Sequence, residues 1–164
     1  MQGVDIVNLL QTSWRYKNVF RGVFPSDRLP NIVNNNIPNA FIINLDTHDK
    51  PGSHWVGLYI TTFGVAVYMD SFGVGPLLPT IKSFISKNSR ALRYNNIVIQ
   101  SLTSQTCGLY ATYFIMKMAD GSSLQQFNTE FNPYSPTYND RRIILLMTSK
   151  LLHGVPDGYK SSVF

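Results

Sequence analysis

Apolar side chains recur along this chain with two different periods, and the changes of period predict its elements. Helical spacing predicts helices over residues 3–11, 77–89 and about 139–153, with a further short helix over 123–131. Alternating and β-branched stretches predict strands over 40–46, 54–61, 65–71 and 94–100, and residues 62–64 join the middle two as a hairpin. Residues 14–30 are aromatic and rich in turn formers. Strands gathered between helices predict an α+β fold, with a central mixed or antiparallel sheet and helices packed around it.

The most apolar of the predicted helices begins at Cys107, which is the only cysteine of the chain. Its apolar residues lie on every face, so we expect a buried helix. The polar run 101–106 offers N-cap side chains, and Asp120-Gly121 offers a C-cap. A helix N-terminus stabilises a thiolate, which favours a nucleophilic role for Cys107. A lone cysteine is also a common inert core residue, so thiol chemistry requires a base and a group that orients it.

The hairpin brings such a pair together. With its turn centred near Thr62, the strands place His54 opposite Asp70. An imidazole held by a carboxylate is the oriented base that a cysteine nucleophile needs. Each residue also has an ordinary interpretation, because His54 follows a turn at the start of a strand and Asp70 precedes a turn.

Two other kinds of site are disfavoured by the residue pattern. Asp46, His48, Asp49 and His54 include metal-ligating types, but they lack a second ligand pair at a familiar zinc spacing. A serine hydrolase is disfavoured because the chain has no Gly-x-Ser-x-Gly elbow. We therefore predict no metal site.

Length and composition favour one domain, residues 1–164, with a sizeable core. A single cysteine excludes an internal disulfide and suits a reducing compartment. Neither a signal peptide nor a membrane span is predicted, so we expect a soluble protein that is unprocessed at its start and has no membrane partner.

Charge is distributed unevenly along the chain. The net charge is +5, and no acidic residue occurs between Asp70 and Asp120. That span carries Lys82, Lys87, Arg90, Arg93 and Lys117. The first four are candidate nucleic-acid contacts; the alternative is an ordinary solvated basic surface.

Three sequence blocks resemble the adenovirus protease (adenain) family and, more distantly, the cysteine proteases that remove ubiquitin-like modifiers. They are HWVGLYI from His54, YMDSFG around Asp70 and QSLTSQTCGLYATYF from Gln100, with a weaker match at NVFRGVFPSDRLP. The resemblance implies an adenain-like fold in which His54 is the general base, Asp70 its partner and Cys107 the nucleophile. It also makes Gln100 the oxyanion residue, since Gln105 does not match the family's spacing, and it places Trp55 beside a narrow substrate cleft.

The same resemblance implies a viral-type cysteine endopeptidase. Such an enzyme matures capsid or core precursor proteins at glycine-containing sites, in an adenovirus relative or a related virophage or transposon-like DNA virus. It would work in the virion and in the nucleus or cytoplasm of the infected cell. The alternatives are an isopeptidase for ubiquitin-like modifiers and a basic DNA-binding virion core protein without catalysis.

No cofactor is required by the sequence itself, but the resemblance implies two activators, duplex DNA and a peptide strand added to the sheet. A disulfide to the activating peptide cannot form here, because Cys107 is the proposed nucleophile. The C-terminal tail, residues 154–164, could supply such a strand within the chain. A loose, dispensable terminus is the alternative.

Overall fold

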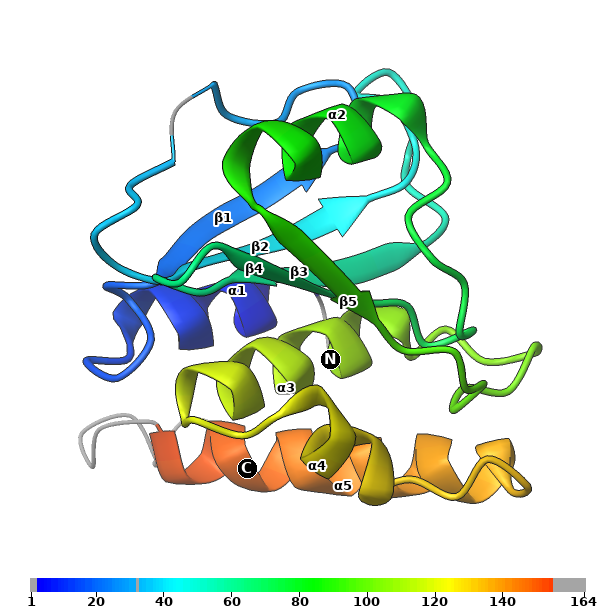
Figure 1. Cartoon of the computed structure of the whole chain (residues 1–164). Helices are drawn as coiled ribbons and strands as arrows, with labels where there is room; N and C mark the ends of the chain where they lie inside the picture. The colour runs from blue at the N-terminus through cyan, green and yellow to red at the C-terminus, as the bar shows by residue number, and fades with distance from the viewer. Residues whose placement is uncertain (1–2, 32, 155–164) are drawn as a thin grey trace.

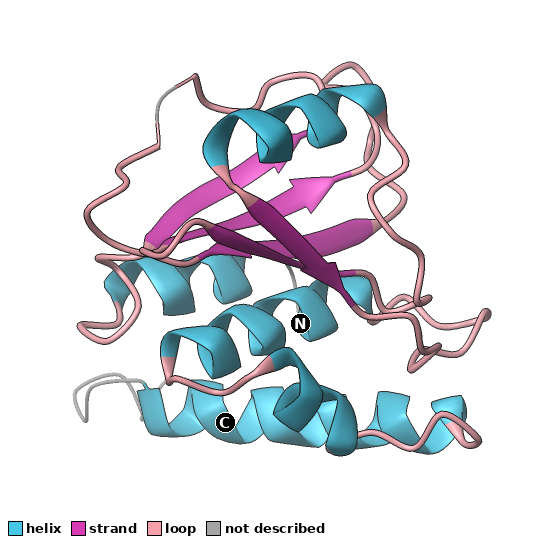
Figure 2. Cartoon of the chain, in the orientation of Figure 1, coloured by secondary structure: helices cyan, strands magenta, loops and turns pink. Residues whose placement is uncertain are grey.

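The structure is a computed structural model that describes residues 3–31 and 33–154 (Figures 1 and 2). Its elements are, in chain order, α1 (Gly3–Thr12), β1 (Phe20–Pro25), β2 (Asn39–Asn44), β3 (Trp55–Ile60), β4 (Val65–Met69), α2 (Pro79–Asn88), β5 (Ala91–Tyr94), α3 (Cys107–Ala119), α4 (Leu124–Thr129) and α5 (Pro136–Gly154). The predicted α+β class, with helices around a central sheet, is confirmed.

Within the described part of the chain, the sheet has five strands in the order β1-β2-β3-β4-β5. The two outer pairs are parallel and the inner strands are antiparallel, so the sheet is mixed. Figure 1 shows α2 over one face of the sheet, α1 and α3 over the other, and α5 on the far side of α3. The helix that begins at Cys107 is therefore enclosed between the sheet and α5.

Two hydrophobic cores lie on opposite faces of the sheet, because successive side chains of each central strand point to opposite sides. Side chains on one face of the sheet, such as Phe41, Leu58 and Tyr68, pack with the buried face of α2. Side chains on the opposite face, such as Ile42 and Tyr59, pack with α3. Both faces of these strands are covered, which is why they read as nearly continuous apolar runs.

Helix α3 lies unusually close to the sheet at Gly57. A Cβ atom at Gly57 would come within 2.5 Å of the Phe114 ring. The absence of a side chain on β3 thus sets how near α3 approaches the strand that follows His54.

The predicted register of the β3–β4 hairpin was wrong by two positions. The ladder pairs Gly57 with Met69, whereas a turn centred on Thr62 would pair Gly57 with Val67. The reason is a three-residue connection closed by the bond from Thr61 N to Val65 O, with Gly64 at φ +75°, which centres the turn on Phe63. A shift of two keeps every side chain on its predicted face.

Two edge strands also differ from prediction. A strand was expected over 94–100, but β5 lies earlier and ends at Tyr94. It ends there because the side chain of the next residue, Asn95, takes up the backbone N–H and C=O of Asp70. Strand β1 was not predicted. It contains a bulge at Gly22 (φ +134°) and ends in Pro25, features tolerated on the edge of a sheet.

The C-terminal helix α5 begins one turn earlier than predicted, with Pro136 as its first residue. Of the tail proposed as an internal activator, Gly154 is the last residue of α5, and residues 155–164 lie outside the described part of the chain. Over the described ranges, no helix has the length and hydropathy needed to cross a bilayer.

Candidate active site

A tight turn after β4 supplies one side of the site. Asp70, Ser71, Phe72 and Gly73 follow the last residue of the strand, and Gly73 N–H donates to Asp70 O (2.8 Å). Gly73 has φ +71°, and a Cβ there would lie 2.7 Å from the backbone carbonyl carbon of Ile97. The turn therefore requires glycine.

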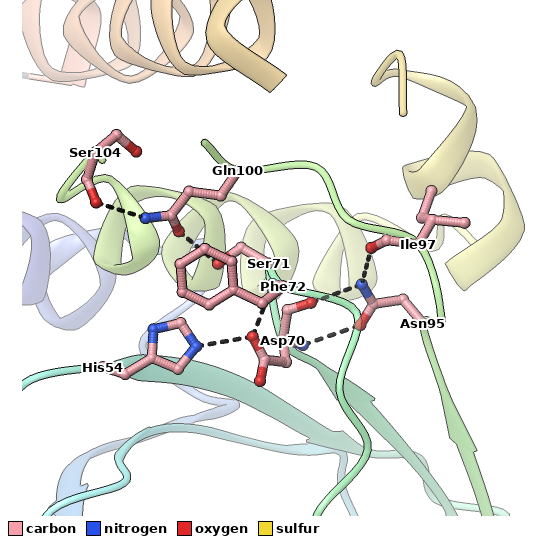
Figure 3. A network of polar contacts seen from close by, with 8 residues as sticks. All are labelled: His54, Asp70, Ser71, Phe72, Asn95, Ile97, Gln100 and Ser104. Atoms are coloured by element: carbon pink, nitrogen blue, oxygen red, sulfur yellow. Dashed lines mark hydrogen bonds and ion pairs between the residues drawn. The ribbon is translucent and has the colours of Figure 1, made fainter. Parts of the chain in front are cut away.

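Asp70 and Phe72 together hold the imidazole of His54 (Figure 3). His54 Nε2 lies 2.7 Å from Asp70 Oδ1, and the Phe72 ring stacks on the imidazole at 4.9 Å between centroids. Phe72 N–H also donates to Asp70 Oδ1 (2.8 Å). With Nε2 engaged by the carboxylate, Nδ1 is the nitrogen left to face a nucleophile. The predicted His54–Asp70 pair is thus brought together, although the two residues lie beyond the end of the strand ladder.

Asn95 fixes the backbone of Asp70 from the opposite side. Its Oδ1 accepts from Asp70 N–H (2.9 Å), and its Nδ2 donates to Asp70 O (2.7 Å). Asn95 is buried, so these bonds are shielded from water. The sequence does not predict this role of Asn95, because a single asparagine in a loop carries no signal for such a contact.

Cys107 is the first residue of α3 and is 7% exposed. Burial raises the pKa of the thiol, but the hydrogen bond with His54, the N–H groups of Trp55 and Gly108 and the charge of His54 together lower the pKa below its ordinary value. The Gly108 N–H belongs to the first turn of α3, where unpaired amides favour negative charge. Geometry and electrostatics both favour a thiolate.

The pKa of His54 shifts in the opposite direction to that of Cys107. Burial disfavours its charged form, but the hydrogen bonds to Asp70 and Cys107, with the charges of these two groups, raise the pKa of His54 to about 9. A lowered thiol pKa beside a raised imidazole pKa favours a thiolate–imidazolium pair near neutral pH. Such a pair can attack a carbonyl carbon and protonate a leaving amine.

The predicted N-cap of α3 was wrong in its detail. Thr106 occupies the N-cap position without a side-chain cap bond, since its hydroxyl donates to Asp140 Oδ1 (2.9 Å). No side-chain oxygen of the N-cap residue therefore competes for the amides of this helix end. The C-cap at Asp120-Gly121 is confirmed, with Gly121 at φ +90° and its N–H bonded to Met118 O.

Gln100 lies near the same turn and is 1% exposed. Its Oε1 accepts from the Ser71 hydroxyl (2.6 Å), and its Nε2 donates to Ser104 O (2.9 Å) (Figure 3). Gln105, the other glutamine of this loop, is exposed. Of the two glutamines, Gln100 is therefore the one whose buried side-chain amide is held in a fixed orientation by hydrogen bonds.

Asp140 of α5 holds both ends of the loop between Gln100 and Cys107. Its Oδ2 accepts from Ser101 N–H (3.1 Å), while its Oδ1 accepts from the hydroxyls of Thr106 and Tyr110. This buried carboxylate was also missed from the sequence, because it lies in a helix far along the chain.

The remaining predicted residues fall in three places. Trp55 opens β3, and its backbone N–H lowers the pKa of the Cys107 thiol. That its ring lines the substrate cleft stays a prediction. Lys82, Lys87 and Arg90 line hollows beside α2, while Arg93 lines a separate hollow beside α4. Arg93 thus lines a different hollow from the other three basic residues.

The histidines of the rejected metal site have separate partners. His48 Nδ1 lies 2.6 Å from Asp27 Oδ2, whereas His54 is bound to Asp70. Within residues 3–31 and 33–154, no cluster of three histidine, cysteine, aspartate or glutamate residues has the arrangement of a metal site.

The opposed pKa shifts predict a bell-shaped pH profile for any thiol-dependent cleavage. The rate should rise as the Cys107 thiol ionises, below the ordinary thiol pKa, and should fall near pH 9 as His54 loses the proton required by the leaving group. Asp70→Asn removes a group that raises the His54 pKa, so the alkaline limb should move to lower pH. Measuring kcat/KM across pH for both proteins tests this prediction, and an unmoved alkaline limb would contradict it.

Comparisons with known proteins give a sequence relative but no family model that matches this chain. The relative is a protein of Acanthamoeba polyphaga mimivirus named "Putative thiol protease R355". The alignment is 31% identical over 116 residues and covers 58% of this chain and 38% of the mimivirus protein. The chain therefore matches well under half the length of this relative.

Solved structures show where the same fold occurs. Two crystal structures of the ASFV pS273R protease superpose with TM-scores of 0.57 and 0.56, at 17% and 18% identity. The first superposition covers 86% of this chain and 66% of the ASFV chain, and the second covers 77% and 60%. ChlaDub1 from Chlamydia trachomatis superposes with a TM-score of 0.51 at 14% identity, over 73% of this chain and 61% of that protein. The resemblance to adenovirus enzymes in particular stays a prediction. The solved structures share the fold of this chain, and the mimivirus protein, which is named a putative thiol protease, shares part of its sequence.

Proposed function

We propose that this chain is a cysteine endopeptidase whose nucleophile is Cys107. The observation that carries the proposal is the arrangement of His54, which is bound to Asp70 through Nε2 and is coupled to a thiol of lowered pKa at the N-terminus of a buried helix. A fixed base and a helix end, which outweigh the effect of burial, are the conditions under which a cysteine becomes reactive rather than inert.

The reaction follows from these positions. Cys107 Sγ forms a bond to the scissile carbonyl carbon, and the negative charge moves to the carbonyl oxygen. Gln100 Nε2 and the Cys107 N–H donate to that oxyanion. As the C–N bond breaks, His54 gives its proton to the leaving amine. Water then attacks the thioester while His54 takes a proton from it, and breaking the C–S bond releases the acid and restores the Cys107 thiolate and the His54 imidazolium.

We further propose that the substrates are capsid or core precursor proteins cleaved at glycine-containing sites in a virion or infected cell. The mimivirus and ASFV origins of similar proteins support a viral setting. Trp55, at the start of β3 beside Cys107, is the proposed wall of a narrow cleft that would favour small residues.

An isopeptidase acting on ubiquitin-like modifiers is equally compatible with this site and fold. Both reactions use a thiolate, a base and an oxyanion donor, and they differ in the substrate bound. A comparison of two fluorogenic substrates separates them, one an internal glycine-containing peptide and the other a ubiquitin-like protein carrying a C-terminal reporter. We expect faster turnover of the internal peptide, and turnover of the reporter protein alone would replace the endopeptidase with the isopeptidase.

A non-catalytic DNA-binding core protein is the third candidate. Incubation of the native protein with a thiol-reactive probe at neutral pH tests it, because a buried inert cysteine should not be labelled. Coexpression of wild type and Cys107→Ala with candidate virion proteins then tests whether cleavage depends on the thiol. Absence of both labelling and cleavage would remove the enzymatic proposal.

Duplex DNA as an activator remains a proposal, supported by the acid-free span that carries Lys82, Lys87, Arg90 and Arg93. Contacts to phosphates should make stimulation of peptide cleavage fade as salt rises. Because Arg93 lines a different hollow from the other three, its neutral variant should weaken stimulation less than neutral variants beside α2. A flat response to DNA at low salt would remove nucleic acid from the account.

A further inference from the structure

Ser71 is fully buried and follows directly after the residue that binds His54. Its carbonyl oxygen accepts from Ile99 N–H (2.9 Å) and Gln100 N–H (3.2 Å). Its hydroxyl donates to Gln100 Oε1 at 2.6 Å. Ser71 thus holds the backbone of the proposed oxyanion residue as well as its side chain, and Figure 3 shows the side-chain contact.

The partners of Gln100 determine which way its amide group points. Ser104 O is a carbonyl oxygen and can only accept, so it must face Nε2. Oε1 then faces Ser71, whose hydroxyl acts as the donor. An Nε2 group carries two N–H bonds, and Ser104 O takes one of them. The second is the donor that an oxyanion would use.

Loss of the Ser71 hydroxyl would weaken this arrangement in two ways. The amide would keep only one of its two orienting partners, and a rotated amide would present Oε1, an acceptor, to an oxyanion. In addition, a donor on Oε1 polarises the amide and strengthens the N–H groups as donors.

From these contacts we propose that Ser71 is a positioning residue that orients and polarises the Gln100 amide for oxyanion binding. The inference rests on the proposed cysteine peptidase function. It assigns different tasks to neighbouring residues of one turn, since Asp70 holds the base while Ser71 holds the oxyanion donor.

The test is a double-mutant cycle on peptide cleavage. Ser71→Ala should lower kcat about tenfold with little change in KM, less than the loss of the donor itself because Ser104 still holds Nε2. In a Gln100→Ala background, Ser71→Ala should change kcat by less than about twofold, because the group it orients is absent. The labelling rate of Cys107 should not change, since the hydroxyl acts away from the thiol.

Two further variants separate positioning from general stability. Ser26 is another buried serine, whose hydroxyl bonds Asp46 O outside the site (3.2 Å), so Ser26→Ala is the matched control and should keep full kcat. Ser71→Thr retains a hydroxyl and should stay within about threefold of wild type. It also serves if Ser71→Ala does not fold, because a folded Ser71→Thr protein with the activity of Gln100→Ala would overturn the inference.

The inference and the proposed function fail in different ways. Full kcat in folded Ser71→Ala, or an equal loss in the presence and absence of Gln100, overturns the positioning role alone. A wild-type protein that neither cleaves peptides nor reacts with a thiol probe overturns the proposed function itself.

Discussion

Cys107→Ala is expected to abolish peptide cleavage, and His54→Ala is expected to come close to the same loss. The thiolate and the imidazole act as a unit, so removing either one leaves the other without a partner. Each raises the fraction of the other in its charged, reactive form, as their opposed pKa shifts indicate. The measurement is kcat/KM on a glycine-containing peptide, with circular dichroism to establish that both variants fold.

The chain offers a matched control for the histidine. His48 is also bound to an aspartate, at 2.6 Å from Asp27, but it lies in an exposed loop before β3. His48→Ala should therefore leave kcat/KM within about twofold of wild type, since it removes a surface pair of little energetic weight. Equal losses from His48→Ala and His54→Ala would show that the His54 effect is not catalytic.

Gln100→Ala is expected to lower kcat by a factor on the order of 10² to 10³, the usual cost of losing one oxyanion donor. KM should change less, because the donor acts on charge that develops in the transition state. Steady-state kinetics on the same peptide measure both constants. Labelling of Cys107 should stay near the wild-type rate, since alkylation forms no oxyanion.

Gln105→Ala is the control for this loop. Gln105 is exposed, whereas Gln100 is buried and bonded to Ser71 and Ser104. We expect full activity from Gln105→Ala. If this change is the more damaging of the two, the oxyanion assignment belongs to Gln105 instead.

Local pattern predicted most of the elements. The helix at Cys107 was found because apolar residues fill all its faces and because Asp120-Gly121 ends it, signals that lie within the segment itself. The β3–β4 hairpin was found from alternation. Its register was missed because one residue of difference in the turn centre changes every pair, and that centre depends on the Thr61–Val65 closure and the backbone of Gly64.

Edge elements were harder to predict because their sequences do not resemble buried strands. All four residues of β5 are exposed, so the apolar signal lay further along, at residues 97–99, and the strand was placed too late. In β1 a glycine bulge and a proline interrupt the alternation. Both strands form because a neighbouring strand offers an unpaired edge, which is not visible in the local sequence.

The sequence by itself determined the residue types of the site and two of their relations. It placed the cysteine at a helix start and a histidine and an aspartate at the two ends of one hairpin, because helix and strand periodicity are short-range properties. His54 and Asp70 meet despite the wrong register, since a shift of two leaves both on the same face.

Only the tertiary structure decided how these groups are held. Asn95 supports Asp70, Ser71 supports Gln100, and Asp140 closes the loop that leads to Cys107. These contacts join residues 25, 29 and 39 positions apart in the sequence. Their formation depends on how loops and helices pack rather than on local periodicity, because a buried hydrogen bond is defined by direction and distance, which residue order alone does not specify.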